Sequence, residues 1–219
     1  MQQREVLPKC SPCMPELLHT ILSEHLPQEA RILDVGCGYG ATLAYLQEHS
    51  RFCLYGIEPD AEACRVAQEG CAQAGIECAA AEQMPFGEDA FDALLLECVF
   101  SLLHAPGIPL EQIKRTLRPG GLLLLTDLYA RRAGEGSIKN DPRVRHLYTK
   151  EKLEALLADA GFVLFGFWEE SGKLGAWLAQ SILEGKSESL PGVEARAKMK
   201  ALRAGYGIWL FQNGKKEEW

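Results

Sequence analysis

Short apolar runs alternate with amphipathic stretches along the first 130 residues of the chain. Five of these runs have the length of a buried strand and are bounded by turn residues; they cover Arg31–Gly36, Phe52–Glu58, Ile76–Ala81, Phe91–Cys98 and Leu122–Leu128. Helical spacing follows the first, second and fourth runs, over Ala41–His49, Asp60–Ala74 and Pro109–Leu117. Strands that alternate with helices in this way predict a parallel sheet with helices on both faces.

The last third of the chain is less regular. The N-cap residue Thr149 and the stop residue Gly161 predict a helix over Lys150–Ala160. A sixth strand, two more helices and a final strand are expected at Phe162–Trp168, Gly172–Glu184, Val193–Leu202 and Gly205–Phe211. Two long irregular stretches, Met1–Pro15 and Ala130–His146, are of the kind that often forms lids over binding sites.

Length, hydropathy and charge narrow the class of protein. A chain of 219 residues favours one domain, and no apolar run in it is long enough to span a bilayer. Residues Met1–Val6 lack the apolar core of a secretory signal, so we expect a cytoplasmic protein without membrane insertion. The formal net charge is −7 and there is no basic stripe, which disfavours nucleic acid and favours a small-molecule substrate.

The chain contains eight cysteines, which fall into two groups. Six stand in apolar, element-like segments, where we expect free thiols that pack as small apolar side chains: Cys37, Cys53, Cys64, Cys71, Cys78 and Cys98. Cys10 and Cys13 form a Cys-x-x-Cys pair in the N-terminal arm. Because no second pair matches it, we expect no metal site; the pair either contacts the acceptor or belongs to a structural arm.

A glycine-rich loop follows the first predicted strand. Gly36 and Gly38 let the backbone turn sharply and let a ligand approach main-chain atoms closely. Asp34 stands just before the turn, and Glu58 ends the second predicted strand. The position of Glu58, about 20 residues beyond the glycines, is typical of the acidic residue that binds ribose in nucleoside sites.

Two cofactors are compatible with this loop. Gly36, Gly38 and Ala41 satisfy the Gly-x-Gly-x-x-Ala pattern of dinucleotide sites, which leaves a nicotinamide-dependent oxidoreductase open. An anion at Asp34 would repel a pyrophosphate but would favour the ammonium and sulfonium of S-adenosylmethionine. The methyl-donor interpretation also explains Glu58, because one carboxylate can accept from both hydroxyls of a free ribose. A non-catalytic protein that binds S-adenosylmethionine is a third alternative.

Five segments in order, at suitable spacing, extend the comparison: Ile32–Gly40, Gly56–Asp60, Ala81–Phe86, Phe91–Leu94 and Leu117–Gly121. Together they resemble the class I S-adenosylmethionine-dependent methyltransferases, particularly the branch with the ubiquinone/menaquinone-biosynthesis and arsenite methyltransferases. The resemblance implies a Rossmann-like, doubly wound α/β sheet of seven strands whose last strand is antiparallel, between the fifth and sixth. It divides the chain into an N-terminal arm and helix (a lid, 1–30) and a methyltransferase domain (31–219).

The same resemblance implies a helical insertion over 171–204. This insertion either covers the sheet as a packing element or serves as a substrate-binding or dimerisation element. A homodimer is therefore one of the open alternatives. It also implies which residues bind the cofactor: those of the glycine loop, the acid that holds the ribose, those at the edge of the adenine and those below the methyl donor. These residues are Asp34, Gly36, Cys37, Gly38, Tyr39, Glu58, Pro59, Ala81, Glu82, Gln83 and Glu97. One position departs from the family, because Ala80 stands where many relatives have an acidic residue that reaches the adenine amino group.

Methyl transfer from a sulfonium needs mainly alignment and exclusion of water, and a base only where the acceptor must lose a proton. The candidates for such a base are His104, Tyr129 and His146, which follow the fourth and fifth predicted strands. Arg131 is a candidate for binding an anionic group of the acceptor. Single residues of these types are more often packing or surface residues, and the acceptor itself stays open.

Overall fold

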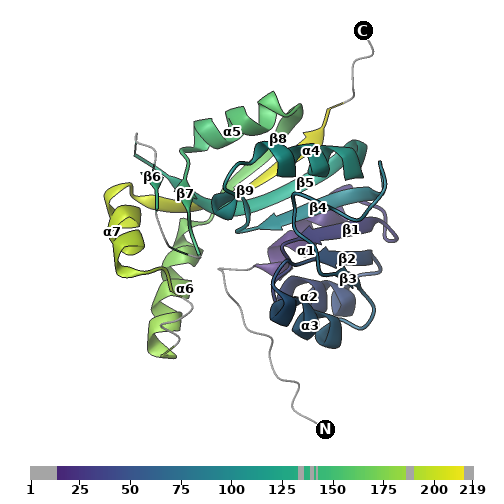
Figure 1. Ribbon diagram of the computed structural model, residues 1–219, viewed down its shortest axis with the longest axis horizontal. Coiled ribbons are helices and arrows are strands. Elements are labelled where there is room, and N and C mark those ends of the chain that lie inside the picture. The colour runs from purple at the N-terminus through teal and green to yellow at the C-terminus, as the bar shows by residue number, and fades with distance from the viewer. Residues whose placement is uncertain (1–13, 133–135, 139–140, 142, 186–189, 215–219) are drawn as a thin grey trace.

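A computed structural model describes residues 14–132, 136–138, 141, 143–185 and 190–214 (Figure 1). Seven strands form one sheet in the order β3-β2-β1-β4-β5-β9-β8. Their bounds are β1 Arg31–Val35, β2 Cys53–Ile57, β3 Gly75–Glu77, β4 Phe91–Glu97, β5 Leu117–Ala130, β8 Phe162–Glu169 and β9 Ala204–Asn213. The first five are parallel, and β9 lies antiparallel between β5 and β8, so the predicted Rossmann-like sheet is confirmed.

Helices cover both faces of the sheet (Figure 1). They are α1 Pro15–His25, α2 Ala41–His49, α3 Ala61–Gly70, α4 Gly107–Thr116, α5 Lys150–Asp159, α6 Ser171–Leu183 and α7 Val193–Ala201, with a 3-10 turn η1 at Phe100–Leu102. The first three and the last two pack into one apolar core, whereas α4 and α5 pack into a second core on the opposite face. Among the described residues, no helix is both long and apolar enough to cross a membrane.

The central strands are buried from both sides. Ile32 and Leu95 belong to the core of α1–α3, while Leu33 and Leu94 belong to the core of α4 and α5, and all four are fully buried. A strand covered on both faces needs apolar residues at every position. This requirement explains why the predicted strands were nearly continuous apolar runs rather than alternating patterns.

Several boundaries differ from the sequence prediction; helix α3, for example, ends at Gly70 rather than at Ala74. Strand β3 ends at Glu77 rather than at residue 81. Strand β5 begins at Leu117 rather than Leu122, because Leu117 already pairs with Phe91 before the chain bulges out of register. The stretch 130–146, expected to be irregular, contains a short antiparallel pair, β6 (Gly136–Ser137) with β7 (His146–Leu147).

The two appended segments pack onto the main sheet where the structure describes them. In the predicted insertion, Leu174 of α6 and Met199 of α7 are buried in the same core as the strands. In the predicted N-terminal lid, Leu18 and Leu22 of α1 are fully buried in that core as well. The lid and dimerisation roles themselves stay predictions, and residues 1–13 lie outside the described residues.

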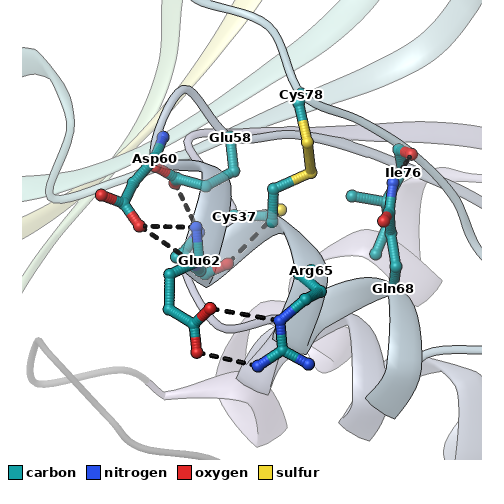
Figure 2. The surroundings of a disulfide bond; sticks show 11 residues. Cys37, Glu58, Asp60, Glu62, Arg65, Gln68, Ile76 and Cys78 are labelled. Carbon is teal, nitrogen blue, oxygen red and sulfur yellow. Dashed lines mark hydrogen bonds and ion pairs between the residues drawn. A yellow bond between two sulfur atoms is a disulfide. The ribbon is translucent and has the colours of Figure 1, made fainter.

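The expectation that all six cysteines in apolar segments are free thiols is wrong. Cys64 on α3 and Cys78, directly after β3, form a disulfide (Figure 2). Gln68 Nε2 also donates to Ile76 O at 2.9 Å, so two links hold α3 against β3. Disulfides persist mainly in oxidising compartments, so this bond gives no support to the expected cytoplasmic location, which stays a prediction.

The disulfide closes a loop with a sequence separation of 14 residues. A loop of this size is expected to stabilise the folded state by about 2–3 kcal/mol, largely by restricting the unfolded chain. We therefore predict that dithiothreitol lowers the free energy of unfolding in urea by that amount. The double variant Cys64→Ser, Cys78→Ser should show the lower value with or without reductant.

The control for this experiment is Cys53→Ser, because Cys53 is an exposed free cysteine. That variant should keep both the wild-type stability and the sensitivity to reductant. Wild-type protein whose unfolding curve is unchanged by reductant would contradict the prediction.

Candidate functional site

The loop 36–40 joins β1 to α2 at the carboxyl edge of the sheet. The main-chain nitrogens of Gly36 and Cys37 donate to Ile57 O at 2.8 and 3.0 Å, which fastens the loop to the end of β2. Gly36 has a φ of +75°, and a Cβ there would lie 2.6 Å from Cγ2 of Val99. Only glycine suits this position, because both the conformation and the close approach exclude a side chain.

Glu58 follows β2 and connects the loop to α3. Its Oε2 accepts from the main-chain nitrogen of Gly38 at 2.9 Å, and its Oε1 accepts from that of Asp60 at 2.9 Å. Asp60 in turn caps α3, as predicted, by accepting from the amides of Glu62 and Ala63 (Figure 2). These bonds hold the Glu58 carboxylate at the strand end, while each oxygen retains a further lone pair.

One cavity of about 400 Å³ lies above these strand ends. All but one of the cofactor-binding residues expected from the sequence line it: Asp34, Gly36, Cys37, Gly38, Tyr39, Glu58, Pro59, Ala81, Glu82 and Glu97. Gln83 is the exception; its side chain is exposed, and its main-chain nitrogen donates to Ala80 O at 3.0 Å. Ala80 itself lines the cavity.

The loop end of the cavity is acidic. Asp34, Glu58 and Glu97 line it together, and they come from the ends of three neighbouring strands, β1, β2 and β4. Asp34 is 2% exposed, and its Oδ1 has no hydrogen-bond partner among the described residues. Burial raises the pKa of Asp34 well above its usual range, and the charges of Glu97 and Glu58 raise it further.

The other end of the cavity has a different lining, formed by the end of β4, η1 and the segment before β7. Its residues are Cys98, Val99, Leu102, Leu103, His104, Arg143 and Arg145. Cys98 has a φ of +56°, which is uncommon for a residue with a side chain and often marks a functional position. The Cys98 nitrogen donates to Thr126 O at 2.7 Å, so the turn is held from β5.

A chain of hydrogen bonds positions the two arginines. Buried Asp127 accepts from the Ser101 nitrogen at 2.7 Å, and Ser101 O accepts from the Arg145 nitrogen at 3.0 Å. Asp141 accepts from the nitrogens of Arg143 and Gly192, at 2.9 and 2.7 Å. The backbone around both arginines is therefore fixed to β5, η1 and the start of α7.

Three of the acceptor-end candidates from the sequence do not line the cavity. Tyr129 is buried in the core of α4 and α5, where its hydroxyl donates to Glu169; burial and Glu169 raise its pKa, which disfavours a role as a base. His146 stacks on Tyr148. Arg131 pairs with Glu169 at 3.5 Å. Their roles as a base or as an anion-binding residue stay predictions.

The other candidates have different outcomes. His104 does line the cavity, as expected for a residue near the acceptor. Cys10 and Cys13 lie outside the described residues, so their role stays a prediction. Arg143 and Arg145 were missed by the sequence analysis, although a signal was present: they flank the fully buried Val144, and residues two apart in an extended segment point the same way.

Residues 33–125 match the family model described as Methyltransferase domain. A fatty-acid O-methyltransferase of Mycolicibacterium smegmatis is 30% identical over 115 residues, which cover 51% of this chain and 42% of that protein. The methyltransferase GfsG of Streptomyces halstedii is 29% identical over 109 residues, which cover 46% of this chain and 38% of that protein. The chain thus spans about two fifths of the length of these curated relatives.

Solved structures share the fold over nearly the whole chain. The crystal structure of the cyclase SpnF has a TM-score of 0.71 and 22% identity, covering 91% of this chain and 81% of that one. A geranyl diphosphate C-methyltransferase from Streptomyces coelicolor, in complex with S-adenosyl-L-homocysteine, has a TM-score of 0.72 and 15% identity, covering 90% and 77%. Identities this low show the fold alone.

The matched segment, the order of the seven strands and the loop at the end of β1 define the class of this domain. Residues 33–125 are thus similar to a methyltransferase domain, and the sheet around them has the strand order of the Rossmann-like methyltransferase fold. The antiparallel β9 also separates this sheet from the dinucleotide-binding fold, in which the corresponding strands are parallel.

The acidic end of the cavity fits the cofactor that this class implies. A buried carboxyl group with an oxygen that lacks a hydrogen-bond partner, beside two further carboxylates, needs a cation to be stable in its ionised form. S-adenosylmethionine carries an ammonium, a sulfonium and one carboxylate at its methionine end, which gives that end a net positive charge. A pyrophosphate would add negative charge to the same place, so the geometry disfavours the nicotinamide alternative.

We predict that binding of S-adenosylmethionine depends on pH through Asp34. Since burial and neighbouring charges raise the pKa of the free carboxyl group and a cation lowers it, affinity should increase as pH rises from 5 to 7, with release of a proton. This range stays below the usual pKa of an α-amino group, about 7.7–8.0. Calorimetry in buffers of different ionisation enthalpy measures both the affinity and the proton count.

In Asp34→Asn the pH dependence should be lost, whereas the exposed Glu88→Gln, outside this cavity, should retain it. An affinity of the wild type that stays flat over this range, without proton release, would contradict the prediction.

Proposed function

We propose that this protein transfers a methyl group from S-adenosylmethionine to a small-molecule acceptor. The observation that carries the proposal is the cavity in which Asp34, Glu58 and Glu97 meet beside a loop where Gly36 leaves no room for a side chain. The family match of residues 33–125 and the names of the curated relatives support the same reaction. Because the match covers only part of those relatives, the activity of the whole protein is our proposal.

Each part of the cavity has a separate task in this proposal. Asp34 and Glu97 would bind the positive end of the cofactor, and Glu58 would hold the ribose hydroxyls with its remaining lone pairs. Ala81 and Glu82 would lie at the adenine edge. When bound, the cofactor supplies a methyl group on a positively charged sulfur, which is already activated for transfer.

The acceptor end would orient the second substrate and exclude water. Val99, Leu102 and Leu103 provide apolar surface beside the carboxylates, and such surface favours a closed, water-poor site. His104 is the only histidine that lines this cavity in the described part of the chain. In the proposal, alignment of donor and acceptor supplies most of the rate acceleration.

The narrower expectations from the sequence belong to this proposal. The likeness to ubiquinone, menaquinone and arsenite methyltransferases places quinols and arsenite among the acceptors to be tested. A homodimer finds support in the exposed apolar side chains Ile182, Leu183 and Val193, at the end of α6 and the start of α7.

Calorimetry with S-adenosylmethionine, S-adenosylhomocysteine and NAD tests the cofactor. The first two should bind and NAD should not. Glu58→Ala should weaken binding of both about 10- to 100-fold, the usual effect of losing hydrogen bonds to a charged group. Glu62→Ala is the matched control, because Glu62 stands at the start of α3 but pairs with Arg65 on the surface.

Turnover is tested with isotope-labelled methyl donor and a panel of quinols, thiols, amines, carboxylates and arsenite. Transfer of label to at least one class, lost in Glu58→Ala, is the expected result. Binding of NAD alone would overturn the proposal. Donor binding without transfer to any acceptor would support the non-catalytic alternative instead.

A further inference from the structure

The cavity is divided by charge. Asp34, Glu58 and Glu97 line it from the ends of β1, β2 and β4, and the guanidinium-bearing residues Arg143 and Arg145 line it from the segment before β7; we call these two parts its acidic and basic ends. The acidic end suits the cofactor, as argued above. The cofactor's positive groups would not be placed beside two arginines. Its one carboxylate sits on the same carbon as the ammonium that the acidic end would bind, so it does not account for the basic end.

Among the described residues, these two charges are not paired with acids: neither guanidinium forms an ion pair with an acidic side chain. The two nearby acids are committed to main-chain amides: Asp127 accepts from Ser101 and Leu128, and Asp141 accepts from Arg143 and Gly192. Both arginines are only partly exposed, so water cannot fully surround them.

His104 also lines this end and brings no negative charge to it. The Arg145 guanidinium contacts Nε2 of His104. Arg143 and Arg145 therefore leave the basic end with hydrogen-bond donors and without a described anion to receive them.

The surface between the two charged ends is largely apolar. Val99, Leu102 and Leu103 line this part of the cavity together with Cys98. Leu103 is 7% exposed, so its position is set by the core and not by solvent. A molecule that spans the acceptor end would therefore contact apolar side chains along its body and two cationic side chains at its end.

On the basis of the proposed function, we propose that the methyl acceptor is an organic anion with an apolar body. Arg143 and Arg145 would bind its carboxylate or phosphate group, a geometry for which the planar guanidinium is well suited. Val99, Leu102 and Leu103 would contact the body. The methyl group would be transferred to a different atom of the acceptor, nearer Asp34, Glu58 and Glu97.

In this proposal the anionic group binds the acceptor to the arginines, and it is not the nucleophile that receives the methyl group. Two guanidinium groups stabilise the negative charge of a carboxylate before the reaction, and methylation of that carboxylate would remove the charge. Such an arrangement would bind the ground state more tightly than the transition state and would slow transfer. An anion that keeps its charge throughout is compatible with both arginines.

The test is calorimetry on the full chain saturated with S-adenosylhomocysteine, with octanoate, octyl phosphate and uncharged octanamide as probes. At least one of the two anions should bind about tenfold or more tightly than octanamide, and their ratio distinguishes a carboxylate from a phosphate group. In Arg143→Gln, Arg145→Gln the anion affinity should fall about 10- to 100-fold, while octanamide and S-adenosylhomocysteine bind as before.

The control is Arg132→Gln, because Arg132 is exposed and does not line the cavity; its anion affinity should equal that of the wild type. Equal binding of the anions and octanamide, no anion binding at all, or an unchanged anion affinity in the double variant would overturn the inference. Failure of S-adenosylhomocysteine to bind the wild type would instead overturn the proposed function, and titration of the same probes without it still reports on the arginines.

Discussion

The burial of the Asp34 carboxyl group beside two other acids is the constraint around which the site is built. A charge removed from water is costly, and neighbouring charges of the same sign increase the cost. Asp34 has one oxygen without a hydrogen-bond partner among the described residues, and its pKa is raised well above the usual range. A ligand that compensates the free energy of burying this charge is therefore needed, and a cation at the same place would compensate it.

The sheet brings these acids together. Strand β1 lies between β2 and β4, so residues at the carboxyl ends of all three strands meet at one edge. This is also the place where the chain order of the parallel strands reverses, and crevices for ligands form at such points in α/β sheets. Gly36 keeps the crevice open, because a side chain at that position would collide with Val99. Fold and electrostatics thus favour the same cofactor site.

Much of this could be predicted from the sequence, because strands buried on both faces need continuous apolar runs and because Asp34 and Glu58 stand at diagnostic distances from the glycines. The position of Tyr129 could not. Residues 122–125 are all leucine, so the pattern did not indicate which face each side chain of β5 would take, and Tyr129 turned into the core of α4 and α5.

The disulfide and the basic end of the cavity were missed for a related reason. Cys64 and Cys78 meet only because α3 packs against β3, a tertiary contact that spacing does not reveal. Arg143 and Arg145 flank a buried valine. In an irregular stretch this pattern does not tell where the side chains point, because their direction depends on the contacts of the backbone with β5 and η1. Sequence patterns report burial and local turns well, and they report the partners of a loop poorly.

The central claim, that the acidic cluster binds the positive end of S-adenosylmethionine, is tested most directly by a crystal structure of the complex. We expect the methionine end against Asp34 and Glu97, and the ribose hydroxyls within hydrogen-bond distance of Glu58. A cofactor bound elsewhere, or in this cavity with its ribose away from Glu58 and its positive end away from the acids, would contradict the account.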